Sequence, residues 1–376
     1  MRVLIDYRPA LRQRSGVGEY THELARALIT AFPPNGPGGR LDLTLFSSSL
    51  KDRFIPGAEL AGAASVDRRV PVSLLNFAWH RLNWPAAETL ARGAFDVTHS
   101  LHPLLLPARD AAQVITIHDL NFLSHPERTR AEIRRDYPAL ARDHARRADA
   151  IIVVSQFTAR EVEQSFDVPR ARISVCSPGA PAWPPREGPP ADGGYVLFFG
   201  TLEPRKNLGG LLDAYERLAA RRRDLPSLVI AGQATDAARV WLDRLAGEPL
   251  RSLVRHIGYV DPSRRRALYE GARVLVQPSF EEGFGIPVLE AMALGVPVIA
   301  ANRGALPEVV GDAGLIIDPE NADELAAAIE RVVDDGELAA GLAASGVRRA
   351  RQFSWARTAQ HVHAAYERAI ERRRTR

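Results

Sequence analysis

The feature that most constrains the fold of this chain is the repeated alternation of short apolar segments with longer amphipathic ones. The short segments are rich in β-branched and aromatic residues and predict buried strands, whereas the longer ones predict helices. Such alternation is typical of parallel α/β architecture. The predicted strands are 3–5, 41–46, 95–99, 114–117, 151–154 and 173–175, then 196–199, 228–231, 254–257, 274–276, 298–300 and 315–317.

A segment rich in proline and glycine separates the two series of predicted strands, and its composition predicts an interdomain linker. A chain of 376 residues is long enough for two domains of ordinary size. We therefore predict an α/β protein with two doubly wound, Rossmann-like parallel-sheet domains that face each other across a deep cleft. The predicted boundaries are 1–178 for the N-terminal domain, 179–194 for the linker, 195–354 for the C-terminal domain and 355–376 for a final helix.

Two adjacent cations, Arg205 and Lys206, follow the first predicted strand of the C-terminal domain. Asn207 is suited to cap the helix that comes next, so the cations lie in a strand-to-helix loop, where open α/β sheets bind their ligands. Only two of the 49 basic residues are lysines, which suggests that a compact ammonium is needed in this loop. We predict that the pair binds a diphosphate. The alternative is a surface lysine, which is our interpretation of Lys51.

The segment 282–290 reads EGFGIPVLE and places two carboxylates, Glu282 and Glu290, eight positions apart. Pro287 suits the first turn of a helix, and the two glycines before it allow backbone conformations that side chains forbid. A helix that begins here presents N–H groups to an anion. Because a carboxylate repels phosphate, each acid is expected to accept from a hydroxyl group. The alternative is an ordinary glycine-rich loop with two solvated glutamates.

A glycine pair, Gly16 and Gly18, lies in the sequence Ser15-Gly-Val-Gly before a helix predicted over 19–30. Backbone N–H groups in such a loop can approach a diphosphate, although a plain loop is an equal alternative. The sequence lacks the full G-x-G-x-x-G spacing, which disfavours a dinucleotide-dependent dehydrogenase.

His118 follows the predicted strand 114–117, and Asp119 comes next. A histidine at a strand end can donate or accept near a reacting sugar, and the alternative is a structural histidine. Four other histidines, His80, His99, His102 and His125, are alternative candidates for this role near the sugar. These histidines do not have metal-ligand spacing, so we predict no bound metal.

The sequences Gly200-Thr-Leu-Glu-Pro-Arg-Lys-Asn and Glu282-x7-Glu290 resemble the signature of retaining glycosyltransferases of family 4, which have the GT-B fold. The resemblance extends over most of the chain and includes the segments 15–18, 116–119 and 154–158. It implies transfer of a hexose from a nucleoside diphosphate sugar to an acceptor hydroxyl, with attack on the face from which the diphosphate departs. It also implies that the final helix packs back on the N-terminal domain.

The resemblance assigns roles to the candidate residues. Without a metal or other cofactor, Arg205, Lys206 and the helix N-terminus stabilise the leaving diphosphate. Glu282 holds donor-sugar hydroxyls, Glu290 holds ribose hydroxyls, and His118 positions the sugar. Backbone contacts from Gly283, Phe284 and Gly285 shape the sugar pocket. Many relatives carry an arginine where this chain has Thr201, and Arg205 is the candidate to replace that charge.

The Glu-Pro-Arg-Lys-Asn variant resembles that of bacterial mannosyltransferases that build surface polysaccharide or glycolipid, which makes GDP-mannose the first candidate donor. The acceptor is then a sugar or a lipid-linked sugar. Two alternatives stay open: a sugar-nucleotide epimerase of the same fold, and a non-catalytic protein that binds sugar nucleotides.

Composition bears on location and partners. The single cysteine, Cys176, excludes an intramolecular disulfide and is expected to be a buried structural thiol in a cytoplasmic protein. No apolar run approaches the ~20 residues of a membrane span, and the N-terminus does not resemble a signal peptide. The net charge is +4 and the isoelectric point is near 9.4.

Basic residues gather in a helix predicted over 128–147 and in the C-terminal run 372–376. They are either solvated faces or contacts with an anionic membrane that carries a lipid-linked acceptor. Interleaved aromatic residues and recognition motifs are missing, so nucleic acid is not an expected partner.

Overall fold

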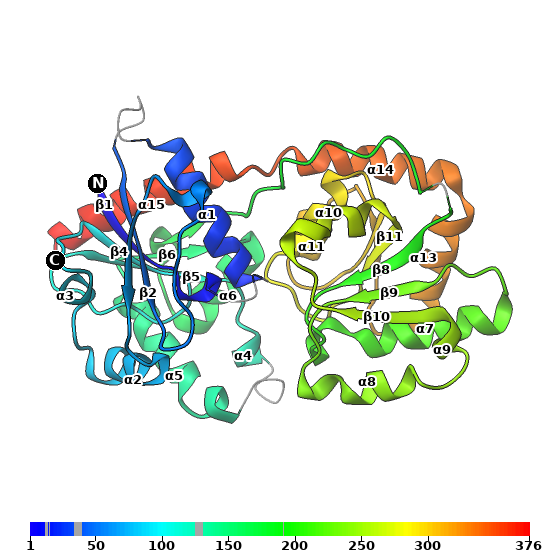
Figure 1. Cartoon of the computed structure of the whole chain (residues 1–376), viewed down its shortest axis with the longest axis horizontal. Helices are drawn as coiled ribbons and strands as arrows, with labels where there is room; N and C mark the ends of the chain where they lie inside the picture. The colour runs from blue at the N-terminus through cyan, green and yellow to red at the C-terminus, as the bar shows by residue number, and fades with distance from the viewer. Residues whose placement is uncertain (12–13, 15, 34–39, 125–130, 191) are drawn as a thin grey trace. The chain divides into compact units, whose positions relative to one another are not determined.

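The chain forms two compact units, each built around one parallel sheet (Figure 1). The computed structural model describes all residues except 12–13, 15, 34–39, 125–130 and 191, together with the side chains of 124 and 131–135. The first unit comprises Met1–Gly179 and Ser354–Arg376, and the second comprises Ala180–Phe353. Most of the segment predicted as a linker therefore belongs to the second unit, where Arg186 donates to the carbonyl of Ala272 at 2.6 Å.

The first unit contains a seven-stranded sheet in the order β3-β2-β1-β4-β5-β6-β7, and all of its strand pairs are parallel. This is the Rossmann order with one additional strand. The strands are β1 (Arg2–Asp6), β2 (Asp42–Ser48), β3 (Ala64–Arg68), β4 (Val97–Ser100), β5 (Ala112–Ile117), β6 (Ala150–Val153) and β7 (Ile173–Val175). The helices are α1 (Val17–Ala31), α2 (Val72–Leu82), α3 (Ala87–Ala91), α4 (Asn121–Ser124), α5 (Ala131–Arg147), α6 (Gln156–Phe166) and α15 (Trp355–Arg374).

The second unit contains a six-stranded parallel sheet in the order β10-β9-β8-β11-β12-β13, which is again the Rossmann order. Its strands are β8 (Tyr195–Phe199), β9 (Leu228–Ala231), β10 (Val254–Gly258), β11 (Ala272–Gln277), β12 (Val298–Ala301) and β13 (Leu315–Ile317). The helices are α7 (Leu208–Arg221), α8 (Arg239–Arg244), α9 (Leu250–Leu253), α10 (Pro262–Glu270), α11 (Ile286–Ala293), α12 (Leu306–Val310), α13 (Ala322–Asp334) and α14 (Gly336–Ala350).

The predicted fold class is confirmed, and all twelve predicted strands are present. The prediction missed β3, whose sequence Ala-Ser-Val-Asp-Arg carries a single large apolar residue. This strand pairs only with β2 and lies at the edge of the sheet, where its side chains are exposed or half-buried. An edge strand needs few apolar residues, so the periodic signal was too weak to detect.

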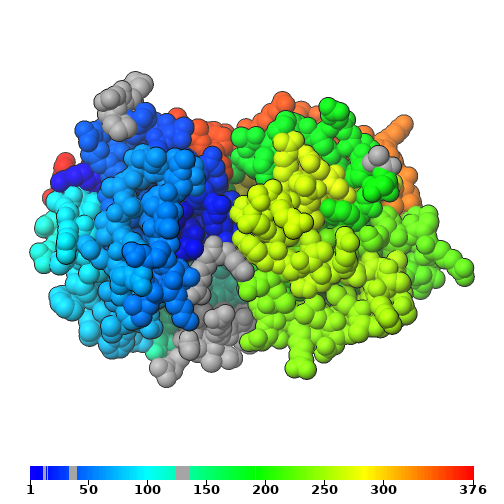
Figure 2. Space-filling model, in the orientation of Figure 1, coloured from blue at the N-terminus to red at the C-terminus, as the bar shows by residue number. Residues whose placement is uncertain are grey.

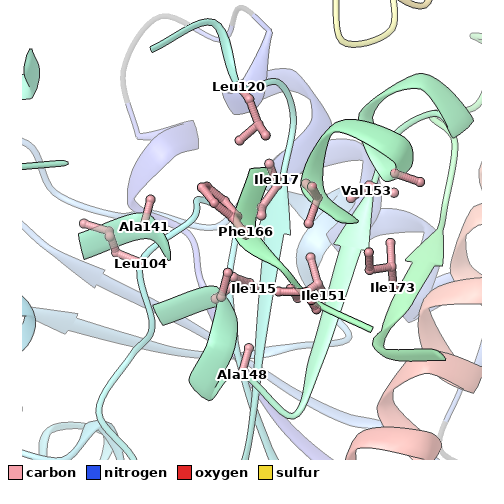
Figure 3. Packing of buried hydrophobic residues seen from close by; sticks show 14 of the residues in the cluster. Leu104, Ile115, Ile117, Leu120, Ala141, Ala148, Ile151, Val153, Phe166 and Ile173 are labelled. Atoms are coloured by element: carbon pink, nitrogen blue, oxygen red, sulfur yellow. The ribbon is translucent and has the colours of Figure 1, made fainter. Parts of the chain in front are cut away.

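The core of the first unit depends on the alternation of side chains along β5. Ile115 and Ile117 point to one face, where they meet α5 and α6 through residues such as Ala141 and Phe166 (Figure 3). Thr116 points to the other face, where α15 covers the sheet. The cluster on the first face also includes Leu104, Leu105, Leu120, Ala145, Ala148, Ile151, Val153, Ala159, Val162, Val168 and Ile173.

The C-terminal helix α15 is tied to this unit by a buried polar network. The Tyr366 hydroxyl lies 2.7 Å from Nδ1 of His99, and Nε2 of His99 lies 2.8 Å from the Thr116 hydroxyl. At the end of the helix, Arg372 and Arg373 donate to backbone carbonyls of the same unit. The C-terminal basic run therefore makes internal hydrogen bonds.

The free thiol of Cys176 is buried, as predicted. Burial raises its pKa to about 12, so the thiol stays protonated at neutral pH and is a poor nucleophile.

Six histidines of the first unit have lowered pKa values because burial penalises the imidazolium form, and one of them is His363 of α15. The pKa is about 3 for His80 and His99, and about 4 for His22, His118 and His144. An unfolded chain binds protons on these side chains below about pH 6.5, and the folded unit does not. The free energy of unfolding of the first unit therefore falls as the pH falls from about 6.5 toward 4.

We predict a loss of at least about 2 kcal/mol in the first unit over this pH range, and a smaller loss in the second unit, which contains only His256. Hydrogen exchange followed peptide by peptide at pH 7.5 and pH 5, corrected for intrinsic rates, measures both. Equal losses in the two units would contradict this assignment.

Candidate active site

The predicted phosphate loop and the segment 282–290 lie at the same edge of the second sheet. β8 and β11 are neighbouring parallel strands, and the chain leaves the carboxyl end of each into one of these two segments. The strand order reverses between β8 and β11, which is where open α/β sheets bind ligands. The backbone N–H of Phe280 donates to the carbonyl of Arg205 at 2.8 Å and joins the two loops.

The loop after β8 is shaped by Asn207. Arg205 and Lys206 lie in a short 3-10 turn, Pro204–Lys206, and Asn207, which follows it, adopts φ +54°. Its side-chain oxygen accepts from the N–H of Gly210 at 3.2 Å and caps α7, as predicted. Its amide nitrogen donates to the carbonyl of Pro319 at 2.7 Å, which fixes the loop to the rest of the unit.

The ammonium of Lys206 forms a buried ion pair with the carboxylate of Glu282. Both side chains are nearly inaccessible, with 8% of the lysine and 7% of the glutamate exposed. Oε1 of Glu282 also accepts from Ser279 and Gln277, each at 2.9 Å. Its carboxylate is therefore engaged by donors of the chain itself. The role predicted for Glu282, contact with sugar hydroxyls, requires a sugar to replace one of these donors.

Arg205 completes this cluster. Its guanidinium lies 3.4 Å from Oε2 of Glu282 and 3.0 Å from Glu203, and it remains about one fifth exposed. Burial raises the pKa of Glu282, but Lys206 and Arg205 overcome this and hold it at about 2. Burial lowers the pKa of Lys206, and Glu282 opposes that shift. The cluster therefore joins two basic residues, Arg205 and Lys206, to two carboxylates, Glu282 and Glu203, and the carboxylate of Glu282 is ionised at neutral pH.

Glu290 lies one turn inside α11 and is buried. Its Oε2 accepts from the Tyr269 hydroxyl at 2.8 Å, and its Oε1 lies 3.4 Å from the guanidinium of Arg265. Arg265 also lies over the ring of Phe199, with 5.9 Å between the guanidinium carbon and the ring centroid. Glu290, which is predicted to bind the ribose, is therefore itself held by Tyr269 and Arg265.

Two glycines from different loops shape the backbone around the start of α11: Gly285, directly before the helix, and Gly304, between β12 and α12. Gly285 has φ +100° at the start of the helix, where side chains are strained, and Pro287 follows in the first turn as predicted. Gly304 has φ +61°, and a Cβ there would lie 2.5 Å from the carbonyl oxygen of Glu282. The N–H of Ala305 donates to that same oxygen at 2.8 Å. These contacts fix the backbone that carries Glu282.

Gly283 and Phe284 are buried within this turn, and the Phe284 ring packs edge-on against Phe353 with centroids 5.6 Å apart. The structure therefore brings together six predicted residues of the second unit at one sheet edge: Arg205, Lys206, Glu282, Gly283, Phe284 and Gly285. Glu290 lies on the helix that follows.

The glycines of the first unit differ in their surroundings. Gly16 is exposed, has φ +51° and precedes the first turn of α1. Gly18 is buried, and a Cβ there would lie 2.7 Å from the carbonyl of Pro9, so it is needed for close packing of α1. Ser15 lies outside the described residues.

His118 follows β5 and places Nε2 3.2 Å from the carbonyl of Leu101. Its ring packs edge-on against Tyr20, with centroids 4.9 Å apart. Burial lowers its pKa to about 4, so it is neutral at pH 7. A neutral imidazole can hold a hydroxyl but cannot stabilise an anion by charge.

The competing histidines have other partners. His99 is enclosed by Tyr366 and Thr116, and Nε2 of His102 lies 3.6 Å from the buried carboxylate of Asp6. His80 packs edge-on against His102 with centroids 5.8 Å apart. His125 falls outside the described part of the chain. Among the residues that the structure describes, we find no cluster of His, Cys, Asp and Glu that could hold a metal ion.

The sequence analysis missed the four side chains that hold the two glutamates: Tyr269, Arg265, Gln277 and Ser279. One signal was available for Gln277, because this polar residue directly follows the apolar run Val274-Leu-Val276 in β11. Tyr269 and Arg265 lie on α10, about twenty positions before Glu290, and only the folded chain brings them together.

We predict that the Lys206–Glu282 pair stabilises the second unit. Lys206→Met leaves a buried carboxylate and should lower the free energy of unfolding by about 3 kcal/mol at pH 7. It should also raise the pKa of Glu282 in the folded chain. In the native chain Glu282 loses stability on acidification between its unfolded pKa of about 4.5 and its folded pKa of about 2, so the variant should lose less stability than the native chain over this range.

A double-mutant cycle with Glu282→Gln, read by hydrogen exchange of the second unit, measures the coupling. The control is Lys51→Met, because Lys51 is the other lysine and is exposed. Additive effects of the two substitutions would show that the pair is not coupled.

Comparison with known proteins shows the family of this chain. Residues 14–182 match the family model described as Glycosyltransferase Family 4, and residues 180–349 match the model described as Glycosyl transferases group 1. The chain is 31% identical to an O-antigen chain mannosyltransferase B of Escherichia coli, over 98% of this chain and 100% of that protein. It is 29% identical to a phosphatidyl-myo-inositol mannosyltransferase of Mycolicibacterium smegmatis, over 74% of this chain and 72% of that protein.

A sucrose-phosphate synthase of Thermosynechococcus elongatus has a similar structure, with a TM-score of 0.75 at 20% identity, over 97% of this chain and 98% of that one. At this identity the likeness shows the fold. The family models together extend over residues 14–349, and the Escherichia coli relative aligns along its whole length. The chain therefore belongs to glycosyltransferase family 4 and has the GT-B fold.

Proposed function

We propose that this glycosyltransferase is a retaining, metal-independent hexosyltransferase that takes mannose from GDP-mannose. The observation that carries the proposal is the pair of cations at the carboxyl end of β8, held by Glu282 beside the turn that begins α11. Two fixed positive charges and a helix N-terminus at a strand-order reversal suit a sugar joined to a diphosphate.

The reaction follows from where charge develops. The bond between the anomeric carbon and the diphosphate oxygen breaks, and that oxygen gains negative charge. A bond forms between the anomeric carbon and the acceptor oxygen, and the acceptor proton moves to the departing phosphate. The products are a glycoside of unchanged anomeric configuration and a nucleoside diphosphate. Arg205, Lys206 and the first N–H groups of α11 stabilise the departing charge.

The remaining residues position the donor. Glu290, with Tyr269 and Arg265 around it, binds the ribose, and Gly283, Phe284 and Gly285 shape the sugar pocket. Glu282 orients Arg205 and Lys206 and reaches the sugar when a hydroxyl replaces one of its present donors. On the first unit, His118 contributes a neutral imidazole to the sugar, and Gly16 and Gly18 bring backbone N–H groups to the diphosphate.

The proposed product is a bacterial surface polysaccharide or glycolipid, with a sugar or lipid-linked sugar as acceptor. The names of two relatives support this, because one is an O-antigen chain mannosyltransferase and the other a phosphatidyl-myo-inositol mannosyltransferase. Among the described residues, no helix has the length and hydropathy needed to cross a bilayer. We also propose that the enzyme acts in the cytoplasm, at the surface of the membrane that carries the acceptor.

We predict that Arg205→Ala lowers kcat by about 10²–10³-fold, because it removes one fixed charge from the departing diphosphate. Arg205→Lys should recover part of the loss. Release of nucleoside diphosphate in the presence of acceptor measures the effect. The control is Arg239→Ala, since Arg239 is an exposed arginine of α8 in the same unit. An Arg205→Ala enzyme with normal kcat would rule out this role.

A panel of GDP, UDP and ADP sugars in a thermal-shift assay tests the donor, and GDP-mannose should raise the unfolding temperature most. Turnover in excess EDTA tests metal independence, and the anomeric configuration of the product tests retention. Stabilisation by a UDP sugar alone would contradict the choice of GDP-mannose. Nucleotide release that does not depend on an acceptor would favour an epimerase, and binding without turnover would favour a non-catalytic protein.

A further inference from the structure

Large apolar side chains on the surface of the described chain are concentrated in one stretch of the first unit. Nine such side chains are exposed, and seven of them lie between Leu50 and Trp84. Scattered exposed apolar residues need no explanation, but a concentration of this kind marks an interaction surface. The seven are Leu50, Ile55, Val72, Leu74, Phe77, Leu82 and Trp84.

Helix α2 is the centre of this surface. The inward side of α2 packs on the core of the first unit, where Leu75 and Trp79 are buried in a cluster with residues of β1 and β2. Its outward side is also apolar: Leu74 and Phe77 are each 58% exposed. They lie three positions apart, and Arg81 follows four positions later, so the three side chains form one row along the helix.

The contacts of the buried Trp79 side chain fix α2 on the first unit. The indole N–H of Trp79 donates to the carbonyl of Pro85 at 3.0 Å, and the indole ring lies 5.4 Å from the ring of Phe46. The guanidinium of Arg8 lies 4.8 Å from the same indole. The apolar outward row is therefore presented by a fixed element.

Basic groups border the row at both ends. Near the start of α2, Arg69 donates to the carbonyl of Leu50 at 3.0 Å, and Lys51 follows Leu50. At the other end, Arg81 pairs with Asp136 of α5, which lies beside α2 (Figure 1). The segment from Leu50 to Trp84 contains five basic and three acidic residues, and Asp136 on α5 pairs with one of the five, so basic residues slightly outnumber acidic ones here.

We propose that this surface, the outward row of α2 with Leu50, Leu82 and Trp84, docks onto an anionic lipid bilayer. Apolar side chains that enter the boundary between headgroups and acyl chains, bordered by cations, are the features of a helix that lies in a membrane surface. Trp84, which is 67% exposed, is suited to the headgroup level. In Figure 2 the medium-blue stretch of chain that includes α2 forms much of the visible face of the first unit.

The basic segments that the sequence analysis considered for a membrane are less suited to it. In the C-terminal run, Arg372, Arg373 and Arg376 donate to groups of the first unit. On α5, Arg142 and Arg146 donate to the carbonyls of Ser165 and Phe166. The surface of α2 combines basic residues with exposed large apolar side chains, whereas the described side chains of those two segments include no exposed large apolar residue.

Cosedimentation of the whole chain with phosphatidylcholine vesicles containing about one third phosphatidylglycerol tests the proposal without any sugar nucleotide, so its outcome is separate from the proposed donor and reaction. We expect binding that weakens when salt rises from about 0.05 to 0.5 M, because the charges are exposed. Phe77→Glu combined with Leu74→Glu should weaken binding at least about tenfold. The matched control is Val240→Glu in the second unit, where Val240 is 61% exposed.

Unfolding temperatures of the variants check that the fold is kept, and quenching of Trp84 by brominated lipid, referenced to Trp84→Phe, reports contact directly. The proposal is overturned if the native chain does not bind the vesicles, if the double variant binds as the native chain does, or if vesicles without anionic lipid bind equally well. A native dimer that the double variant converts to a monomer, with vesicle binding unchanged, would assign the surface to a second copy of the chain.

Discussion

The ion pair between Lys206 and Glu282 is the interaction on which the arrangement of the candidate site depends. It joins the loop after β8 to the loop after β11, and those two strands lie at the point where the strand order of the second sheet reverses. A buried pair contributes little net stability unless its remaining hydrogen-bonding capacity is satisfied. Ser279, Gln277 and Arg205 satisfy it here, so the cost of burial is offset while the two cations are held at fixed positions.

This arrangement changes how the Glu-x7-Glu pattern is understood in physical terms. The two glutamates were expected to serve ligand hydroxyls directly, yet each carboxylate is first a partner for side chains of the same unit. Glu282 neutralises part of the charge of Arg205 and Lys206, and Glu290 joins Tyr269 to Arg265. Together with the Glu203 carboxylate beside Arg205, Glu282 relieves the mutual repulsion that two unbalanced cations would suffer in a buried position.

The sequence predicted the strands and helix starts of this protein better than the tertiary contacts between its side chains. Most of the twelve strands could be predicted because parallel strands buried on both faces appear as apolar runs in the sequence, whereas β3 at the sheet edge has no such run. Asn207 and Pro287 marked two helix starts because capping and first-turn preferences are local. The ion pair of Glu282 with Lys206 spans 76 positions, and no local rule foretells which donors surround a buried carboxylate. The close approach of Gly18 to Pro9 and of Gly304 to Glu282 likewise depends on tertiary packing.

The single cysteine has a practical consequence for the study of motion. Cys176 is enclosed, and its pKa of about 12 keeps the thiol protonated, so the native chain should not react with alkylating dyes at neutral pH. A cysteine introduced on an exposed position of each unit can then carry a fluorophore without first mutating the native residue. Energy transfer between two such labels would report the distance between the labelled positions during catalysis. The buried native cysteine would add no dye of its own to this signal.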